Sequence, residues 1–193
     1  MSAANHSTAV NTQHVTLRTA LPANIQQHLL PMARQDWSKH PAFGGSAAFF
    51  IAYHGNLLNT INSLVSQLET LIQLNQSKGY SPTQLQPVLR SGLYLVEKAH
   101  HHHQIEDASY FPQFRKMLPQ FSTAMDLLDD DHLVLDEALH RLKHTIQQAY
   151  GQALLSSYYV ADLYQQAKVL KKVLARHLQD EEEIIIPIFL KYQ

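Results

Sequence analysis

The chain has 193 residues, of which 45% are hydrophobic and 16% charged, enough for one ordinary soluble domain with a substantial core. Its 15 basic and 16 acidic residues nearly balance, so no overall charge would draw it to nucleic acid or to an anionic membrane surface. It has no cysteine and 13 histidines, which excludes disulfides, thiol nucleophiles and sulfur-bound metal sites and leaves nitrogen and oxygen to ligate any metal.

The first 45 residues are predicted to form an N-terminal arm that precedes the main domain. Residues 1 to about 20 are polar and aperiodic, which predicts partial disorder, and they lack the apolar stretch of a secretory signal. A short helix is expected around residues 24–34, followed by Trp37 and the breaker Gly44-Gly45, and this part should pack over one end of the domain. Because the longest apolar runs are too short to cross a bilayer, we expect a cytoplasmic protein without a membrane partner.

Residues 46–193 are predicted to form an all-α domain. Four segments, around residues 47–71, 85–109, 125–146 and 160–184, repeat apolar residues with alternating spacings of three and four, which is typical of one face of a helix in a bundle. In the second segment this core-facing stripe reads Leu85, Val88, Gly92, Leu95, Ala99, His102, Glu106 and Ser109. Short breaks rich in Gly, Pro and Ser separate the segments, so we expect an up-down-up-down four-helix bundle.

Strongly metal-ligating side chains interrupt each of the four stripes. They are His54 on the first, His102 and Glu106 on the second, His132 on the third, and His177 and Glu181 on the fourth. Each His-x-x-x-Glu pair places its carboxylate one helical turn beyond its imidazole on the same face. Only one histidine of the run 100–103 falls on the stripe, and the other three are predicted to lie on the surface.

The spacing along the chain predicts that these four histidines meet in one layer. In an antiparallel hairpin, two residues at the same height have their sequence midpoint in the turn that joins the helices. The midpoint between His54 and His102 is residue 78. The midpoints between His102 and His132 and between His132 and His177 are residue 117 and residues 154–155. All three midpoints lie in predicted breaks, so the layer should be common to all four helices.

A dry layer of this composition predicts two bound cations. Transferring a charge into a protein core costs several kcal/mol, and two facing carboxylates also repel each other. Two metal ions compensate that cost if the carboxylates bridge them and each ion takes two imidazoles, with positions left for a solvent-derived bridge and a small exogenous ligand. Nitrogen and oxygen ligands suit iron, with manganese or zinc as substitutes. The alternative is a hydrogen-bonded His–Glu network without metal.

The order of these residues resembles that of the hemerythrin-like, HHE cation-binding family. The pattern of that family is a lone His, a His-x-x-x-Glu, a second lone His and a second His-x-x-x-Glu, and the match covers roughly residues 45 to 190. His54 matches the first position, His102 and Glu106 the second, His132 the third, and His177 and Glu181 the fourth. The resemblance implies a non-haem di-iron site that binds oxygen, nitric oxide or peroxide.

Several neighbours of these residues are candidates for supporting roles. Asp136 stands where oxygen-carrying hemerythrins have a further histidine, which argues against a carrier role and makes Asp136 a candidate seventh ligand or a partner of a ligand. A carboxylate of residues 129–131 or 182–183 is a candidate to orient a histidine through its second nitrogen, although solvated side chains are the simpler prediction there. Tyr53 and Tyr110 are predicted to pack rather than to contact a bound molecule.

We expect a di-iron protein that binds or senses a small ligand, because the stripes offer no wide substrate cleft and no nucleophile with its base. The alternatives are a di-iron enzyme acting on nitric oxide or peroxide and an iron donor or store. A role in iron–sulfur cluster repair is disfavoured, because the chain lacks the cysteine-containing segment of the relatives linked to that role.

Overall fold

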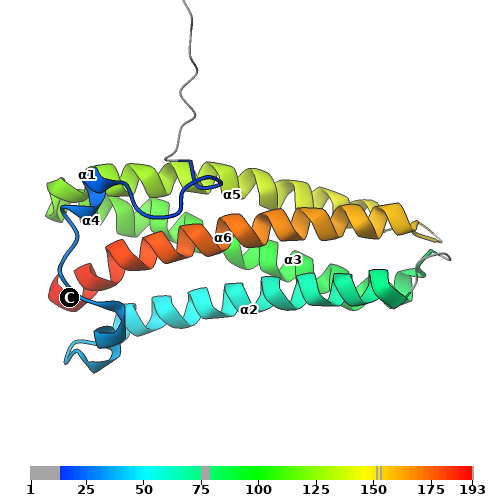
Figure 1. The fold of residues 1–193 in the computed structure, drawn as a ribbon, viewed down its shortest axis with the longest axis horizontal. Helices are drawn as coiled ribbons and strands as arrows, with labels where there is room; N and C mark the ends of the chain where they lie inside the picture. The colour runs from blue at the N-terminus through cyan, green and yellow to red at the C-terminus, as the bar shows by residue number, and fades with distance from the viewer. Residues whose placement is uncertain (1–13, 75–78, 151, 153, 193) are drawn as a thin grey trace, which may run out of the picture.

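The computed structural model consists of four long helices packed side by side along one axis (Figure 1). It describes residues 14–74, 79–150, 152 and 154–192. The four helices are α2 (Gly45–Leu74), α3 (Pro82–Ile105), α5 (Ser122–Gln148) and α6 (Ser157–Tyr192). Successive long helices run antiparallel, which confirms the predicted all-α, up-down-up-down bundle. No helix in the described ranges combines the length and apolar character that a membrane span requires.

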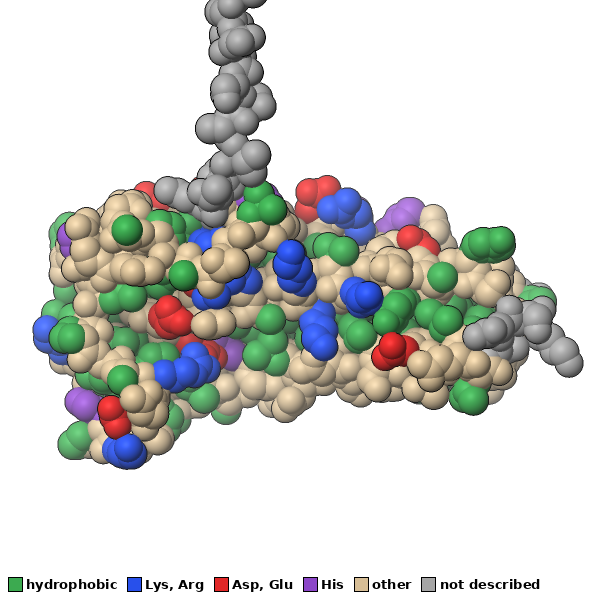
Figure 2. Space-filling model, viewed as in Figure 1, with side chains coloured by type: hydrophobic (Ala, Val, Ile, Leu, Met, Phe, Trp, Pro, Cys, Tyr) green, Lys and Arg blue, Asp and Glu red, His purple; other side chains and the backbone are tan. Residues whose placement is uncertain are grey.

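A covering segment, residues 14–44, precedes α2 and crosses one end of the bundle (Figure 1). It contains α1 (Ala23–Gln26) and the 3-10 helix η1 (Arg34–Lys39). Val15, Leu21 and Trp37 are buried, so apolar side chains anchor the segment along its length. In the space-filling view the segment and the helices form a continuous surface at this end, where basic and acidic side chains lie near one another (Figure 2). The disorder prediction for residues 1 to about 20 is wrong for residues 14–20, where Val15 and Arg18 are buried. The rest of that prediction concerns residues 1–13, which lie outside the described residues.

The start of α3 follows from its local sequence. The Ser81 hydroxyl accepts a hydrogen bond from the Gln84 amide, and the Gln84 side chain accepts one of 2.9 Å from the Ser81 amide. This reciprocal pair satisfies two amides that have no partner inside the helix. The capping box therefore fixes where α3 begins, and with it the height of His102 and Glu106 along the bundle.

The connection between α3 and α5 is itself mostly helical. α3 continues into a π-helical turn, η2 (Glu106–Tyr110), then into α4 (Phe111–Met117) and the 3-10 helix η3 (Pro119–Phe121). Regular hydrogen bonding thus extends well beyond the end of α3. The chain reverses its direction near residue 118, where the backbone leaves the helical conformation.

The π-helical turn changes which side chains face the core. The amide of Phe111 donates to the carbonyl of Glu106, five residues earlier, so this turn holds one residue more than an α-helical turn. The prediction that Ser109 lies on the core-facing stripe is therefore wrong, since Ser109 is exposed and Phe111 is completely buried. The wide turn begins at Glu106, so the residues that precede it keep the predicted helical phase.

Two apolar clusters occupy the interior. The aliphatic cluster fills the half of the bundle near the α2–α3 and α5–α6 connections, with Leu64, Leu95, Leu139 and Leu170 as fully buried members. The aromatic cluster lies at the opposite end, under the covering segment. Its aromatic members are Trp37, Phe50, Phe111, Phe114, Phe121 and Phe189. On α2, α5 and α6, and between Ala99 on α3 and Phe111 on α4, a short polar stretch separates the two clusters, so a polar layer lies between them.

Candidate metal centre

All six side chains predicted as metal ligands lie in this polar layer. α2 supplies His54, α3 supplies His102, the first residue of η2 is Glu106, α5 supplies His132, and α6 supplies His177 and Glu181. Their exposed fractions range from 0 to 4%. The fold thus brings side chains from all four long helices to one level of the bundle and removes them from solvent.

The potential ligand atoms that face the interior of the layer fall into two groups, while a third group, Asp107, Asp129 and His132, lies at its outer side with Asp107 exposed. A two-histidine half consists of His54, His102, Glu106 and Glu181, and a three-histidine half consists of His103, His132 and His177. Within each half, one nitrogen or oxygen of every residue lies within 4.8 Å of those of the others. The Nε2 atoms of His54 and His102 are only 2.7 Å apart. Such spacing is compatible with one ion for each half.

His103 is a member of the layer that the sequence prediction missed. The prediction that it lies on the surface is wrong, because only 2% of it is exposed and its ring stacks on that of His132, with 4.1 Å between ring centroids. The core-facing stripe of a bundle helix is more than about 100° wide, so positions three and four residues after Ala99 both point inward. His102 and His103 occupy those two positions, and this spacing was the signal that could have identified His103.

The two glutamates lie between the halves. Oε1 of Glu106 is 2.9 Å from Nε2 of His102, and its Oε2 is 3.5 Å from Nε2 of His132. Glu181 is placed in the same way, with one carboxylate oxygen 3.4 Å from the Nε2 atom of the α2 histidine and 3.6 Å from that of the α6 histidine. Each carboxylate therefore reaches an imidazole from both halves.

Seven buried side-chain atoms in the described ranges have no hydrogen-bond partner, and all of them belong to this layer. They are both carboxylate oxygens of Glu106 and of Glu181 and the Nε2 atoms of His103, His132 and His177. Leaving one buried polar atom unpaired costs about 1–3 kcal/mol. Carboxylate oxygens and imidazole nitrogens are also the donors that hold divalent and trivalent first-row metals, so the residues fit metal ions on chemistry as well as on geometry.

Burial shifts the pKa values of the inner groups towards their uncharged forms. Desolvation raises the pKa of Glu106 and that of Glu181 to about 8, and the neighbouring Glu106 adds to the rise at Glu181. Desolvation also lowers the pKa of His102, lowers that of His103 to about 4, and lowers that of His177 well below its ordinary value. Without bound cations, these five groups are therefore mostly uncharged at pH 7.

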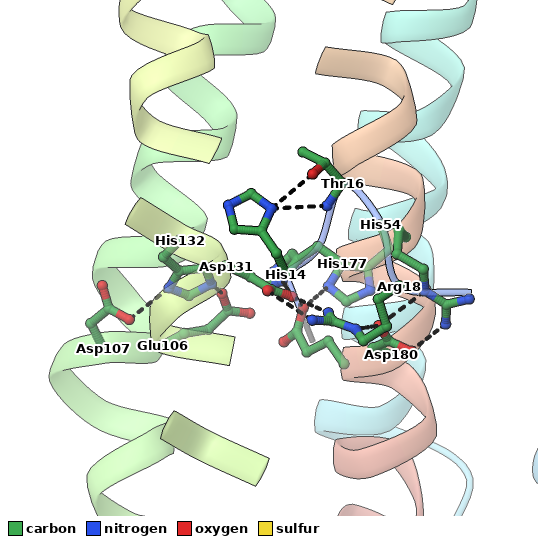
Figure 3. Close-up of polar contacts among 12 residues, drawn as sticks. His14, Thr16, Arg18, His54, Glu106, Asp107, Asp131, His132, His177 and Asp180 are labelled. Carbon is green, nitrogen blue, oxygen red and sulfur yellow. Dashed lines mark hydrogen bonds and ion pairs between the residues drawn. The ribbon is translucent and has the colours of Figure 1, made fainter. Parts of the chain in front are cut away.

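Carboxylates hold the outer nitrogens of four imidazoles. The Nδ1 distances are 3.0 Å from His54 to Glu182, 3.3 Å from His103 to Asp136, 2.8 Å from His132 to Asp107, and 3.4 Å from His177 to Asp131. Figure 3 shows the last two of these contacts. A carboxylate at Nδ1 keeps the proton there and leaves the Nε2 lone pair facing inward, which is the usual arrangement of metal-ligating histidines.

These contacts decide between the roles left open for the neighbouring residues. Asp131 and Glu182 are buried and face histidines, so they are not solvated side chains. The Asp136 side chain is 52% exposed and faces the outer nitrogen of His103, which makes it a partner of that histidine rather than an inward-facing ligand. Tyr53 donates a 3.0 Å hydrogen bond to the carbonyl of Lys98, in agreement with the predicted packing role.

Two arginines of the covering segment pair with the outer carboxylates. Arg18 lies buried between Asp131 and Asp180, at 2.7 Å from the Asp180 carboxylate (Figure 3). Burial by itself lowers the pKa of Arg18, but the two aspartates raise it overall. Arg34 pairs with Glu182 on the other half of the layer, and its side chain is 55% exposed. In each half, an arginine of the covering segment therefore contacts a carboxylate that in turn contacts a histidine of the layer.

Comparison with known protein families finds one whose model matches most of the chain. The family model described as "Hemerythrin HHE cation binding domain" matches residues 46–189. No curated protein and no solved structure matches the chain. The matched range contains all seven inward-facing residues of the layer, whereas the covering segment with Arg18 and Arg34 lies before it.

Proposed function

Because the chain belongs to the hemerythrin HHE cation-binding family, we propose that it holds two iron ions and uses them to bind or sense a small molecule such as oxygen, nitric oxide or peroxide. The proposed ligands are His54, His102, Glu106, His132, His177 and Glu181. Glu106 and Glu181 would be shared by the two ions, since each carboxylate reaches an imidazole of both halves.

The seven unpaired buried atoms are the observation that carries this proposal. A metal-free network of hydrogen bonds would pair the glutamate oxygens with imidazole N–H groups. Here the outer carboxylates occupy Nδ1 of His132 and His177, and Nε2 of both rings is left unpaired. An arrangement with these unpaired nitrogens and oxygens facing inward suits cations and is unfavourable without them.

Burial of the ligands supports a small exogenous molecule. None of the six proposed ligands is more than 4% exposed, and the aromatic cluster closes the layer on one side while the aliphatic cluster closes it on the other. Iron, when bound, supplies a redox-active centre with positions for such a molecule. The chain supplies the negative charge of Glu106 and Glu181, the fixed protons on the outer nitrogens, and the exclusion of bulk water.

Metal analysis of selected variants tests the proposal. We expect about two iron ions per chain in the freshly purified protein, and loss of stoichiometric iron in His102→Ala and in Glu106→Ala, because each change removes an inward-facing donor. His101→Ala is the matched control, since His101 is exposed on the same helix and should leave the iron content unchanged. Equal loss in all three variants, or iron-free wild-type protein after aerobic and anaerobic iron loading, would contradict the proposal.

Spectra and turnover assays distinguish the functions. A binding or sensing protein should show reversible changes in its iron absorption bands when oxygen, azide or nitric oxide is added, without consumption of the ligand. An enzyme would consume nitric oxide or peroxide over many turnovers. An iron donor or store would release its iron reversibly to a mild chelator at neutral pH.

A further inference from the structure

We propose that His103 is a direct metal ligand, so that one ion is held by three imidazoles (His103, His132 and His177) and the other by two (His54 and His102). This inference rests on the proposed function, because it adds a ligand to the same pair of ions. It makes the two halves of the centre chemically unequal. The family match does not assign it, although the residue lies inside the His-x-x-x-Glu motif, directly after His102.

The inner nitrogen of His103 is placed as those of the other ligands are. Its Nε2 atom is buried and has no hydrogen-bond partner, in common with the Nε2 atoms of His132 and His177. A ligand nitrogen of each of these three residues lies within 4.8 Å of the other two. The rings of His103 and His132 stack at 16° between their planes, and the His177 ring meets His103 edge-on, with 5.8 Å between centroids. The three ligand nitrogens are therefore close enough together to bind one ion.

The outer nitrogen of His103 has the support that a ligand needs. Nδ1 lies 3.3 Å from the carboxylate of Asp136, one helical turn after His132 on α5. The same kind of contact holds His132 to Asp107 and His177 to Asp131. Asp136 is thus a positioning residue, which fixes the tautomer and the ring orientation of His103.

The neighbouring histidines of the run show that His103 is not simply one of several surface residues. His101 is exposed, and the His100 side chain is 34% exposed, whereas His103 is almost completely buried. A neutral histidine buried only for packing would be expected to pair both of its ring nitrogens. His103 pairs the outer nitrogen and leaves the inner one facing two proposed ligands.

Metal stoichiometry of His103→Gly, with His101→Gly as the matched control, tests the proposal. We expect wild-type protein and His101→Gly to retain two iron ions per chain after gel filtration with a weak chelator, and His103→Gly to retain one. Adding free imidazole should restore the second ion in His103→Gly, because imidazole can enter the vacated volume and donate its own nitrogen. A purely structural role for His103 would not predict this rescue.

Asp136→Asn provides a second measurement that does not remove a buried ring. We expect the affinity for one of the two ions to fall by about 10- to 100-fold, while the other ion keeps its wild-type affinity. Two ions held with wild-type affinity in His103→Gly would overturn the proposal and leave the proposed function standing. Failure of the wild-type protein to bind two ions would overturn both.

Discussion

Buried carboxylates occupy two regions of the interior, and the two regions differ in how the negative charge is compensated. The buried carboxylates on the outer side of the layer, Asp131, Asp180 and Glu182, are paired with Arg18 or Arg34. Among the described residues, the inner carboxylates, Glu106 and Glu181, form no ion pair with an arginine or lysine and their oxygens have no hydrogen-bond partner, and burial raises their pKa values to about 8. Buried charges need compensation wherever they lie. The protein supplies its own cations in the outer region and leaves the inner one to metal ions.

The largest expected change in the free energy of unfolding comes from a substitution in the outer region. Arg18→Met keeps most of the apolar stem but removes the cation between two buried carboxylates, and we expect the free energy of unfolding to fall by about 3–5 kcal/mol. Arg176 partly compensates, since its Nε donates a 2.9 Å hydrogen bond to Asp180, but it does not replace the pair with Asp131. Urea denaturation of the metal-free protein measures the change. A loss below about 1 kcal/mol would show that the buried pair contributes no more than a surface pair.

The inner region predicts a pH dependence that metal should abolish. In the folded metal-free chain Glu106 and Glu181 hold their protons up to a pH of about 8, whereas in the unfolded chain they ionise near 4.5. Above pH 6.5 the unfolded histidines are mostly neutral, so the glutamates dominate this difference in bound protons. The folded state then binds more protons, so its stability falls as the pH rises from about 6.5 to about 8, by up to about 4 kcal/mol for both groups together.

Denaturation at several pH values tests this sign. Glu106→Gln removes one titrating carboxyl and should roughly halve the slope in the metal-free protein between pH 6.5 and 8. Below pH 6.5 the lowered pKa values of His102, His103 and His177 act in the opposite direction, because the unfolded chain then binds the extra protons. Stability that rises from pH 6.5 to 8 in the metal-free wild type would contradict the assignment of the inner carboxylates.

Arg34, the exposed arginine of the outer region, should contribute least to the free energy of unfolding. Arg34→Met removes an ion pair whose arginine side chain is 55% exposed, so we expect a loss of about 0–1 kcal/mol in the free energy of unfolding. Both variants delete an arginine of the covering segment that pairs with a histidine-bound carboxylate, but only Arg18 is buried. The difference between their losses of unfolding free energy therefore measures the effect of burial on such an ion pair. Equal losses in the two variants would remove that distinction.

The convergence of six side chains could be predicted because it depends on local regularities. The helical period places His102 and Glu106 on one face, and the midpoints between the histidines depend only on the lengths of the helices and turns. The same regularity explains two of the wrong predictions. His103 was missed because the stripe is wider than one residue for each turn, and Ser109 was misplaced because a π-helical turn adds a residue that periodicity does not reveal.

The arginines of the covering segment could not be identified in this way. Arg18 contacts residues 113 and 162 positions away along the chain, through a segment that has little regular structure. No hydrophobic period or spacing rule connects such distant positions. The sequence offers Asp131 only as a candidate to orient a histidine and gives no signal for Asp180, because acidic runs such as residues 129–131 and 180–183 are more often solvated than paired with a distant arginine.

The contact of Arg18 with Asp180 also sets an order of events during synthesis of the chain. Arg18 is made early, but Asp180 and the two proposed ligands of α6, His177 and Glu181, are made only when translation reaches that helix. Until then the ribosome-bound chain lacks two of its proposed metal ligands and one of the two carboxylates that pair with Arg18. One late stretch of the polypeptide therefore completes both the proposed ligand set and the ion pairs of Arg18 that hold the covering segment.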